Sequence, residues 1–300
     1  VRMRFEVLKR DAEIVFHRSL AEGVPRSVAQ ADLESVWRTL DEEFAFVASC
    51  NVGGESLDEE KIARLRQIAQ RSWQRTLDDR IGLSRDEQRQ LADISPCPLP
   101  AVEQLLDDKP EHIVQRPASE QLPADNPWGF RMRTPASKFN HGELHNLSVS
   151  RGTLTDEERY IVNEHIMQSI IMLDRLPFPR HLRGVPEIAG GHHERMDGKG
   201  YPRRLTRAQM SIPARIMAIA DVFEALTAAD RPYKAPKTLS ESLRIMARMS
   251  REQHLDGDLF EIFLQRGVYR AYAESFLQPE QIDEVNVSDL LAQSRVPQTG

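Results

Sequence analysis

The 300-residue sequence has little cysteine, no long apolar run and no excess of positive charge. Its two cysteines, Cys50 and Cys97, are too few for a disulfide framework, and neither belongs to a Cys-x-x-Cys motif. No apolar run approaches the roughly 18 residues of a membrane-spanning helix, and no signal-peptide pattern opens the sequence. A formal net charge of -6 argues against duplex nucleic acid as a partner. These absences predict a cytoplasmic protein in a reducing compartment.

Sequence patterns typical of strands are also weak, and most of the recognisable patterns are typical of helices. Apolar residues recur at helical spacing, which predicts helices over 1–22, 29–46, 57–77, 185–194, 212–228, 239–249 and 259–265. A further helix is predicted to start after Thr155, because Thr155 and Glu158 form a capping-box pattern. Prolines interrupt residues 93–135, so an irregular connector is predicted there. The sequence therefore predicts an all-α fold.

A group of histidines and one aspartate carries the candidate chemistry. Imidazole and carboxylate groups are the usual ligands of borderline divalent metals, and the candidates are His165, His192, His193 and Asp221. They come from three predicted helices. Adjacent side chains on a regular helix point about 100° apart, so the histidine pair suits two neighbouring ions better than one. A two-metal centre is a common device for phosphoester hydrolysis.

Each candidate also has a purely structural explanation, which stays open on this evidence. A lone histidine such as His165 is more often a helix-flank residue than a ligand. Asp221 is costly to bury in an apolar helix unless it is paired, so an ion pair with Arg215 or Arg231 competes with metal binding. The histidine pair is also compatible with a solvated helix end, and it lacks the second histidine of an HExxH metalloprotease helix. The sequence contains no GxSxG, Walker A or GxGxxG motif.

Two long strings resemble one known family. GGHHERMDGKGYP (residues 190–202), followed by IPARIMAIADVFEALTAADRPYK (residues 212–234), resembles the HD-GYP family of metal-dependent phosphodiesterases, a branch of the HD superfamily. The similarity runs over about residues 152–277 and includes RGTLTDEE and LDGDLFEIFL. The resemblance implies an all-α HD-superfamily domain that hydrolyses cyclic di-GMP to pGpG or GMP. It also implies a centre of two or three divalent ions, with iron or manganese expected.

The resemblance assigns roles to residues by position. The implied metal ligands are His165, His192, His193 and Asp221. The implied phosphate contacts are Arg231 and Lys234, whose charge suits that role. The implied rim of the site is the loop of Gly200, Tyr201 and Pro202, which in the family is associated with the docking of GGDEF-domain proteins.

One expected element of the family is absent. The family is named for a His-Asp dyad that bridges the metals, and this sequence has no His-Asp pair, so no catalytic residue is assigned. The nearest imitation, His145-Asn146, lies too close to His165, and asparagine is a poor bridging anion. The sequence starts within a helical pattern and without an initiator methionine. We therefore favour the interpretation that this chain is a fragment and that the dyad lies upstream of Val1. This interpretation is compatible with a membrane anchor of the parent protein in the upstream region.

The alternative interpretation is a degenerate, non-catalytic receptor for a cyclic dinucleotide, or a docking module for a GGDEF-domain partner. On the favoured interpretation, residues 1–92 form a helical insertion or extension, and residues 93–135 form a proline-rich connector. Residues 136–280 form the C-terminal part of the HD-GYP domain, and residues 281–300 form a tail. The sequence gives no indication of the oligomeric state.

Overall fold

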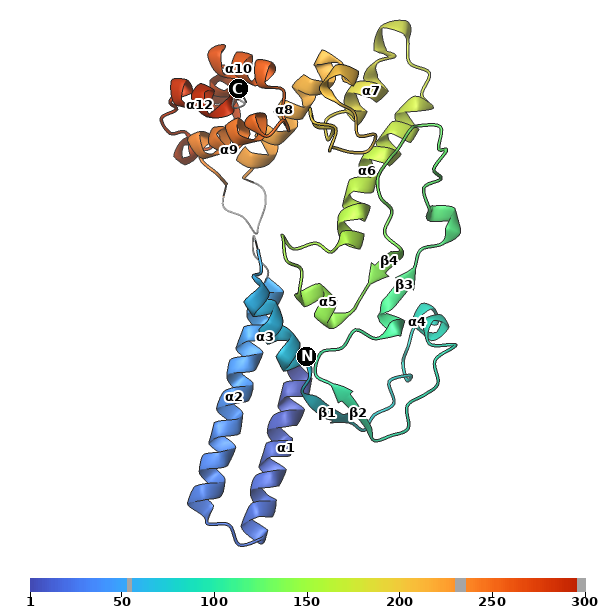
Figure 1. The fold of residues 1–300 in the computed structure, drawn as a ribbon, viewed down its shortest axis with the longest axis vertical. Helices are drawn as coiled ribbons and strands as arrows, with labels where there is room; N and C mark the ends of the chain where they lie inside the picture. Colours follow the sequence, from blue (N-terminus) through green and yellow to red (C-terminus); the bar gives the residue numbers. More distant parts are fainter. Residues whose placement is uncertain (53–55, 230–235, 296–300) are drawn as a thin grey trace, which may run out of the picture. The chain divides into compact units, whose positions relative to one another are not determined.

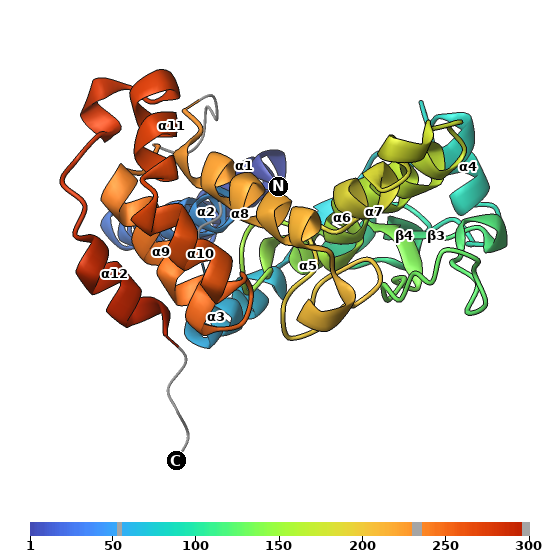
Figure 2. The ribbon, with the colours of Figure 1, turned by 90° about the horizontal axis from the view of Figure 1, so that it is seen from above.

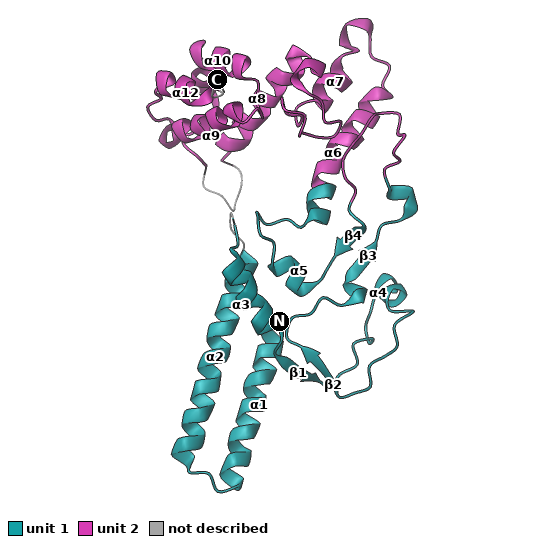
Figure 3. Cartoon of the chain, in the orientation of Figure 1, with its two compact units in different colours: residues 1–121, 135–161 teal, residues 122–134, 162–300 magenta. Residues whose placement is uncertain are grey.

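The computed structural model describes residues 1–300 except 53–55, 230–235 and 296–300. The described residues form twelve α-helices and four short strands, so the predicted all-α class is confirmed. The chain divides into two compact units (Figure 3). Unit 1 comprises residues 1–121 and 135–161, and unit 2 comprises residues 122–134 and 162–300. The predicted domain boundaries rest on the family resemblance and stay predictions.

Unit 1 begins with a long helical hairpin (Figure 1). The helices α1 (Arg2–Ala21) and α2 (Arg26–Val52) pack side by side, and the turn between them contains Gly23 at a φ of 89°. Glycine adopts this left-handed backbone without a steric penalty, which allows the sharp reversal. The rings of Phe5 and Phe44 meet edge to face at 5.4 Å. The helix predicted over 1–22 is confirmed, and α2 extends beyond the predicted 29–46 at both ends.

The rest of unit 1 consists of short elements. These are α3 (Glu59–Ala69), β1 (Ser72–Arg75), α4 (Arg85–Gln90), β2 (Ala101–Gln104), β3 (Ile113–Gln115), β4 (Ser137–Asn140) and α5 (Glu143–Leu147). β1 pairs antiparallel with β2, and β3 pairs antiparallel with β4. The helix predicted over 57–77 is therefore wrong in its last part: it ends at Ala69, and Ser72 already pairs with Gln104.

Unit 2 contains a helical core. Its elements are the second part of α6 (Asp156–Asp174), α7 (Val185–Gly190), α8 (Ile212–Thr227), α9 (Leu239–Arg251), α10 (Gly257–Gln265), α11 (Val268–Phe276) and α12 (Val287–Ser294). Helices α9, α10 and α12 lie side by side (Figure 2). Buried side chains of α8 to α12 form one cluster that includes Phe223, Leu243, Met246, Phe260 and Tyr269. The helices predicted over 212–228, 239–249 and 259–265 are confirmed, whereas α11 and α12 were not predicted.

Part of the predicted connector folds onto unit 2. The irregular connector predicted over 93–135 is only partly right: β2 and β3 lie within it, whereas residues 122–134 contain no helix or strand. The backbone N–H of Arg131 donates to the carbonyl of Pro202 (2.7 Å), and Arg203 Nε donates to the carbonyl of Trp128 (2.9 Å). This irregular segment thus supports the loop that follows the histidine pair.

Five short 3-10 helices complete the description: Pro110–His112, Ala118–Glu120, Arg180–Leu182, Arg207–Gln209 and Pro279–Gln281. Among the described helices, none combines the length and the apolar character that crossing a membrane requires.

Candidate metal centre

His165 lies on α6, whose start is fixed by local sequence. The backbone N–H of Glu158 donates to Thr155 Oγ1 (3.3 Å), and that of Thr155 donates to Glu158 Oε2 (2.9 Å), which confirms the predicted capping box. Ile166 is buried, whereas the neighbouring His165 is exposed at the edge of the buried face. Nδ1 of His165 lies 2.5 Å from the carbonyl oxygen of Val162, so the ring proton belongs on Nδ1. Nε2 is left free for a ligand.

His192 and His193 lie in a turn and not on a helix. The helix predicted over 185–194 is too long, because α7 ends at Gly190. A Cβ at Gly190 would lie 2.6 Å from Cγ1 of Ile170, so the close packing of α7 on α6 requires glycine there. The expectation that helical geometry separates the two histidine side chains is therefore wrong. In the turn, both rings join the same cluster.

The three histidines meet at one point. His165, His192 and His193 each offer a ring nitrogen, and these atoms lie within 4.8 Å of one another. The ring of His193 lies 5.3 Å from that of His165 and 4.2 Å from that of His192. Nδ1 of His192 lies 2.7 Å from the carbonyl oxygen of Ala189, which orients this ring as Val162 orients His165. Such backbone contacts fix the tautomer of a metal-binding histidine.

The electrostatics of His193 favour a neutral ring. Burial lowers the pKa of His193 to about 4, and the adjacent His192 adds to this effect. The ring stacks on Tyr201 at 4.8 Å and 19°. Burial raises the pKa of Tyr201 to about 12, so Tyr201 stays a protonated phenol. A neutral imidazole has a free lone pair, so this donor set fits a divalent transition metal.

The two carboxylates of the same turn serve the loop. Glu194 is 1% exposed and accepts hydrogen bonds from the backbone N–H groups of Arg203 (2.6 Å) and Leu205 (2.8 Å). Asp197 accepts from the backbone N–H of Lys199 (3.0 Å) and from Arg195 Nη2 (3.1 Å). Both carboxylates therefore stabilise the turn by hydrogen bonds. The side chains of this turn that are available as metal ligands are the two histidines.

The predicted rim loop is packed against the histidine turn. A Cβ at Gly200 would lie 2.5 Å from Cα of Glu194, so glycine is needed for this close approach. Pro202 is buried and Tyr201 is half-buried. The backbone N–H of Tyr201 donates to the carbonyl of His193 (3.1 Å). The loop thus holds the histidine turn in place, and its role in docking a partner stays a prediction.

Asp221 lies near the cluster without joining it. It is half-buried on α8, and its charge acts on the pKa of both His193 and Tyr201. Among the described residues, its carboxylate makes no hydrogen bond or ion pair, and it is not within the 4.8 Å group. The competing partner Arg215 donates to Asp256 instead. Arg231 and Lys234 lie outside the described residues, so their predicted phosphate contacts stay predictions.

Sequence reasoning missed His254, which follows α9. Burial lowers the pKa of His254, the charge of Arg195 adds to this, and His254 in turn lowers the pKa of His193. The residue before His254 also contacts the histidine turn: the backbone N–H of Asp197 donates to the carbonyl of Gln253 (3.1 Å). The adjacent LDGDLFEIFL string was the only signal that this region belongs with the site.

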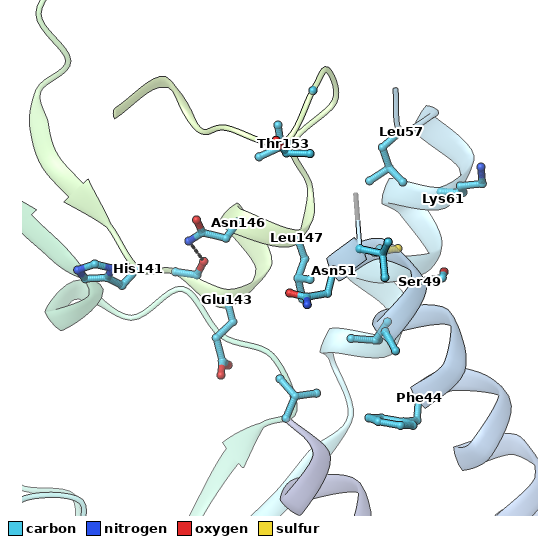
Figure 4. Close-up of a pocket in the computed structure, with 18 of the residues that line it drawn as sticks. Phe44, Ser49, Asn51, Leu57, Lys61, His141, Glu143, Asn146, Leu147 and Thr153 are labelled. Carbon is cyan, nitrogen blue, oxygen red and sulfur yellow. Dashed lines mark hydrogen bonds between the residues drawn. The ribbon is translucent and has the colours of Figure 1, made fainter. Parts of the chain in front are cut away.

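A separate pocket of about 1040 Å³ lies within unit 1 (Figure 4). Its walls mix apolar side chains such as Phe44 and Leu147 with polar ones. Of the polar groups, Glu143 is paired with Arg4 (2.5 Å), and the amide of Asn146 donates to the carbonyl of Gly142 (2.6 Å). All of its lining residues belong to unit 1, whereas the three histidines belong to unit 2. This pocket is therefore a feature distinct from the candidate metal centre.

Comparison with known proteins points to one family. The family model described as an HD domain matches residues 100–259, which is more than half of the chain. This range contains all three clustered histidines and Asp221.

Curated relatives carry related names. A 3'3'-cGAMP-specific phosphodiesterase of Vibrio cholerae is 40% identical over 114 residues, which is 38% of this chain and 26% of the relative. A cyclic di-GMP phosphodiesterase of Thermotoga maritima is 40% identical over 114 residues, 38% of this chain and 30% of the relative. One of Pseudomonas aeruginosa is 38% identical over 119 residues, 39% of this chain and 28% of the relative. The chain is matched over less than a third of the length of these relatives.

Proposed function

The chain belongs to the HD-domain family, and on that premise we propose that it forms the histidine part of a metal-dependent phosphodiesterase site for cyclic dinucleotides. The carrying observation is the cluster of His165, His192 and His193, whose donor atoms lie within 4.8 Å of one another. We propose cyclic di-GMP as the substrate and pGpG as the first product, with GMP as the second. The names of the relatives support this substrate class.

HD domains are metal-dependent, and we infer two or three divalent ions, with iron or manganese as the expected metals. The three histidines and Asp221 would hold them. Bound ions would supply Lewis-acid stabilisation of the phosphate and activation of water. The chain's own residues have a preparatory role. Burial keeps His193 unprotonated, and the Val162 and Ala189 carbonyls orient the other two rings.

Further parts of the site would contact the substrate and a partner. We propose that Arg231 and Lys234 offset phosphate charge, because guanidinium and ammonium groups bind phosphate oxygens strongly. We also propose that GGDEF-domain proteins dock near residues 200–202. Since Gly200 and Pro202 are buried, a docked partner would contact mainly their exposed neighbours, such as Arg204.

A second candidate function is a non-catalytic receptor that binds the dinucleotide or a partner without turnover. The observation that favours it is the absence of a His-Asp pair from these 300 residues. The two functions differ in metal content and turnover. The receptor predicts fewer than two ions per chain with cyclic di-GMP still bound, whereas the enzyme predicts at least two ions in a protein that contains the dyad.

The test measures manganese content and cyclic di-GMP hydrolysis in the 300-residue chain and in a version extended upstream. We expect weak or no turnover by the 300-residue chain, because it lacks a bridging ligand pair, and hydrolysis by the extended version. His193→Ala and Asp221→Ala should each abolish hydrolysis by the extended version. An unchanged rate in those variants would contradict the ligand assignment, and robust hydrolysis by the 300-residue chain would contradict the need for a dyad.

A further inference from the structure

An aromatic side chain from the connector lies beside the loop that follows the histidine pair. Trp128 accepts a hydrogen bond from Arg203 Nε at its carbonyl, and the backbone N–H of Arg131 donates to Pro202. Because Tyr201 precedes Arg203 by only two residues, their Cα atoms are at most about 7.6 Å apart. Tyr201 itself stacks on His193. The Trp128 segment is therefore hydrogen-bonded to the same loop that carries Tyr201.

The ring of Trp128 is held in place and remains partly open to solvent. It stacks on Phe130 with ring centroids 5.9 Å apart and 14° between the planes. Asn126 fixes this turn: its Oδ1 accepts from the backbone N–H of Phe130 (2.8 Å), and its Nδ2 donates to the Phe130 carbonyl (3.0 Å). Trp128 is half-buried, and its indole N–H makes no hydrogen bond to another described residue. An ordered, half-open indole is a preformed surface for a flat ligand.

The two segments that meet here are rich in arginine. Arg131 and Arg133 follow Trp128 in the sequence, and Arg203 and Arg204 follow the histidine turn. None of the four forms an ion pair with an acidic residue in the part of the chain that the structure describes. The guanidinium of Arg203 lies 5.9 Å from the ring centroid of Phe130, beside the stacked pair. Guanidinium groups that lack an acidic partner, together with a half-buried aromatic ring, favour a ligand with both a flat ring and phosphate groups.

We propose that Trp128 is a stacking platform for one purine base of a cyclic dinucleotide, with the flanking arginines facing its phosphates. This inference rests on the proposed function, since it assigns the recognition of the same substrate. Stacking on an aromatic ring tolerates any base, because every base has a π-face. Trp128 therefore contributes to holding a purine without selecting guanine over adenine. The same platform serves cyclic di-GMP and 3'3'-cGAMP.

The first experiment follows tryptophan fluorescence during titration of the 300-residue chain with cyclic di-GMP. A base that stacks on Trp128 quenches its emission, and this quenching should disappear in Trp128→Phe, while Trp37→Phe keeps it. GMP at higher concentration should also quench, whereas ribose 5-phosphate, which has no base, should not. Quenching that is the same in Trp128→Phe, or equal for GMP and ribose 5-phosphate, would overturn the proposal.

The second experiment measures cyclic di-GMP affinity by calorimetry. Trp128→Ala should weaken binding about tenfold or more, and Trp128→Phe should restore most of it, because phenylalanine still offers a ring. Trp37→Phe, a tryptophan change in unit 1, is the matched control and should leave affinity unchanged. Two results together would overturn base stacking in favour of a protein-docking surface. Trp128→Ala would leave the affinity for cyclic di-GMP unchanged, and it would lose binding of an acidic GGDEF-domain protein that the wild type binds.

Failure of this inference is distinguishable from failure of the proposed function. If His193→Ala abolishes metal binding while Trp128→Ala leaves dinucleotide affinity unchanged, only the stacking role of Trp128 is wrong. If His193→Ala leaves metal binding and hydrolysis unchanged but Trp128 is still quenched by cyclic di-GMP, the metal-site assignment is wrong and the platform stands.

Discussion

The two units contain two different histidine environments. In unit 1, Nε2 of His145 lies 3.6 Å from Oε2 of Glu157, a carboxylate that is 8% exposed and also accepts from Ser137 Oγ (2.9 Å). In unit 2, the three clustered rings contact each other and the backbone, and no described carboxylate shares their 4.8 Å group. The two carboxylates that follow the histidine pair, Glu194 and Asp197, are hydrogen-bonded within the loop.

This difference separates structural histidines from candidate ligands. A nearby carboxylate favours the protonated, charged form of an imidazole, with which it forms an ion pair inside the fold. An imidazole that is partly buried beside other imidazoles, as His193 is, favours the neutral form, which is the form that binds a metal. The lowered pKa of His193 shows this effect, with burial as its largest cause. The partners of a histidine therefore say more about its role than the number of histidines nearby.

The largest expected effect comes from removing one clustered ring. His192→Ala should lower manganese affinity by at least about 100-fold, because a direct ligand matters at least as much as the partners that orient it. His145→Ala should leave the affinity within about twofold, since His145 faces Glu157 in unit 1. Equilibrium dialysis of both variants measures this contrast. Equal losses would mean that the two environments are not functionally different.

The next effect concerns the carboxylate that holds the loop. Glu194→Gln leaves one of two buried backbone N–H groups, of Arg203 or Leu205, facing an amide donor instead of an oxygen. We expect the free energy of unfolding to fall by about 1–3 kcal/mol, measured by urea denaturation. Glu241→Gln is the control. Glu241 is exposed and accepts one hydrogen bond from the Thr238 backbone (3.2 Å), so a much smaller change is expected. Similar losses in both variants would contradict the assigned role of Glu194.

Acid should weaken the fold through Glu157. Burial alone would raise the pKa of Glu157, but hydrogen bonds from its own backbone and from Ser137 and Thr155, with the charge of His145, outweigh burial and lower it. The pKa is thus lower in the folded state. Glu157 stabilises the fold above its unfolded pKa of about 4.3, and this contribution is lost as pH falls through the folded pKa.

The stability difference between the wild type and Glu157→Gln should therefore shrink as pH falls from about 5 to about 3. Thermal unfolding of both proteins across this range measures it. Burial raises the pKa of Glu194, so its titration acts in the opposite direction, and acid relieves the cost of burying its charge. A difference between wild type and Glu157→Gln that grows in acid would contradict the account of Glu157.

The smallest effect is expected at the surface of the histidine turn. Nζ of Lys199 lies 3.6 Å from Oδ2 of Asp197, and the Lys199 side chain is 78% exposed. Exposed ion pairs contribute little because water screens them, so Lys199→Ala should change the free energy of unfolding by less than about 0.5 kcal/mol. Manganese binding should be unchanged. A loss of metal affinity would show that the turn depends on its surface charge.

Sequence patterns correctly predicted the helices that are determined by neighbouring residues. The Thr155 capping box and the apolar helix α8 were predicted correctly, because a cap and a helical period lie within a few neighbouring residues. The HD-GYP resemblance is confirmed by the HD-domain match and the named relatives. The three histidines were named as candidates from residue type and motif alone, and the structure brings them together.

What the sequence did not predict depends on distant contacts. α7 ends at Gly190, which packs closely against Ile170 on another helix, and that long-range contact is not visible in the local sequence. The hydrogen bond from Arg203 to Trp128 joins residues 75 positions apart. The four strands form two-stranded pairs, which are too short to show a clear alternating pattern. Tertiary contacts thus decide how the turn and the connector meet.

Diffraction from crystals of the chain soaked in manganese tests the central claim most directly. The account predicts an anomalous peak bound by nitrogen atoms of His165, His192 and His193 at about 2.0–2.3 Å, with His145 unliganded. A manganese peak elsewhere, with none of the three rings bound to metal, would contradict it.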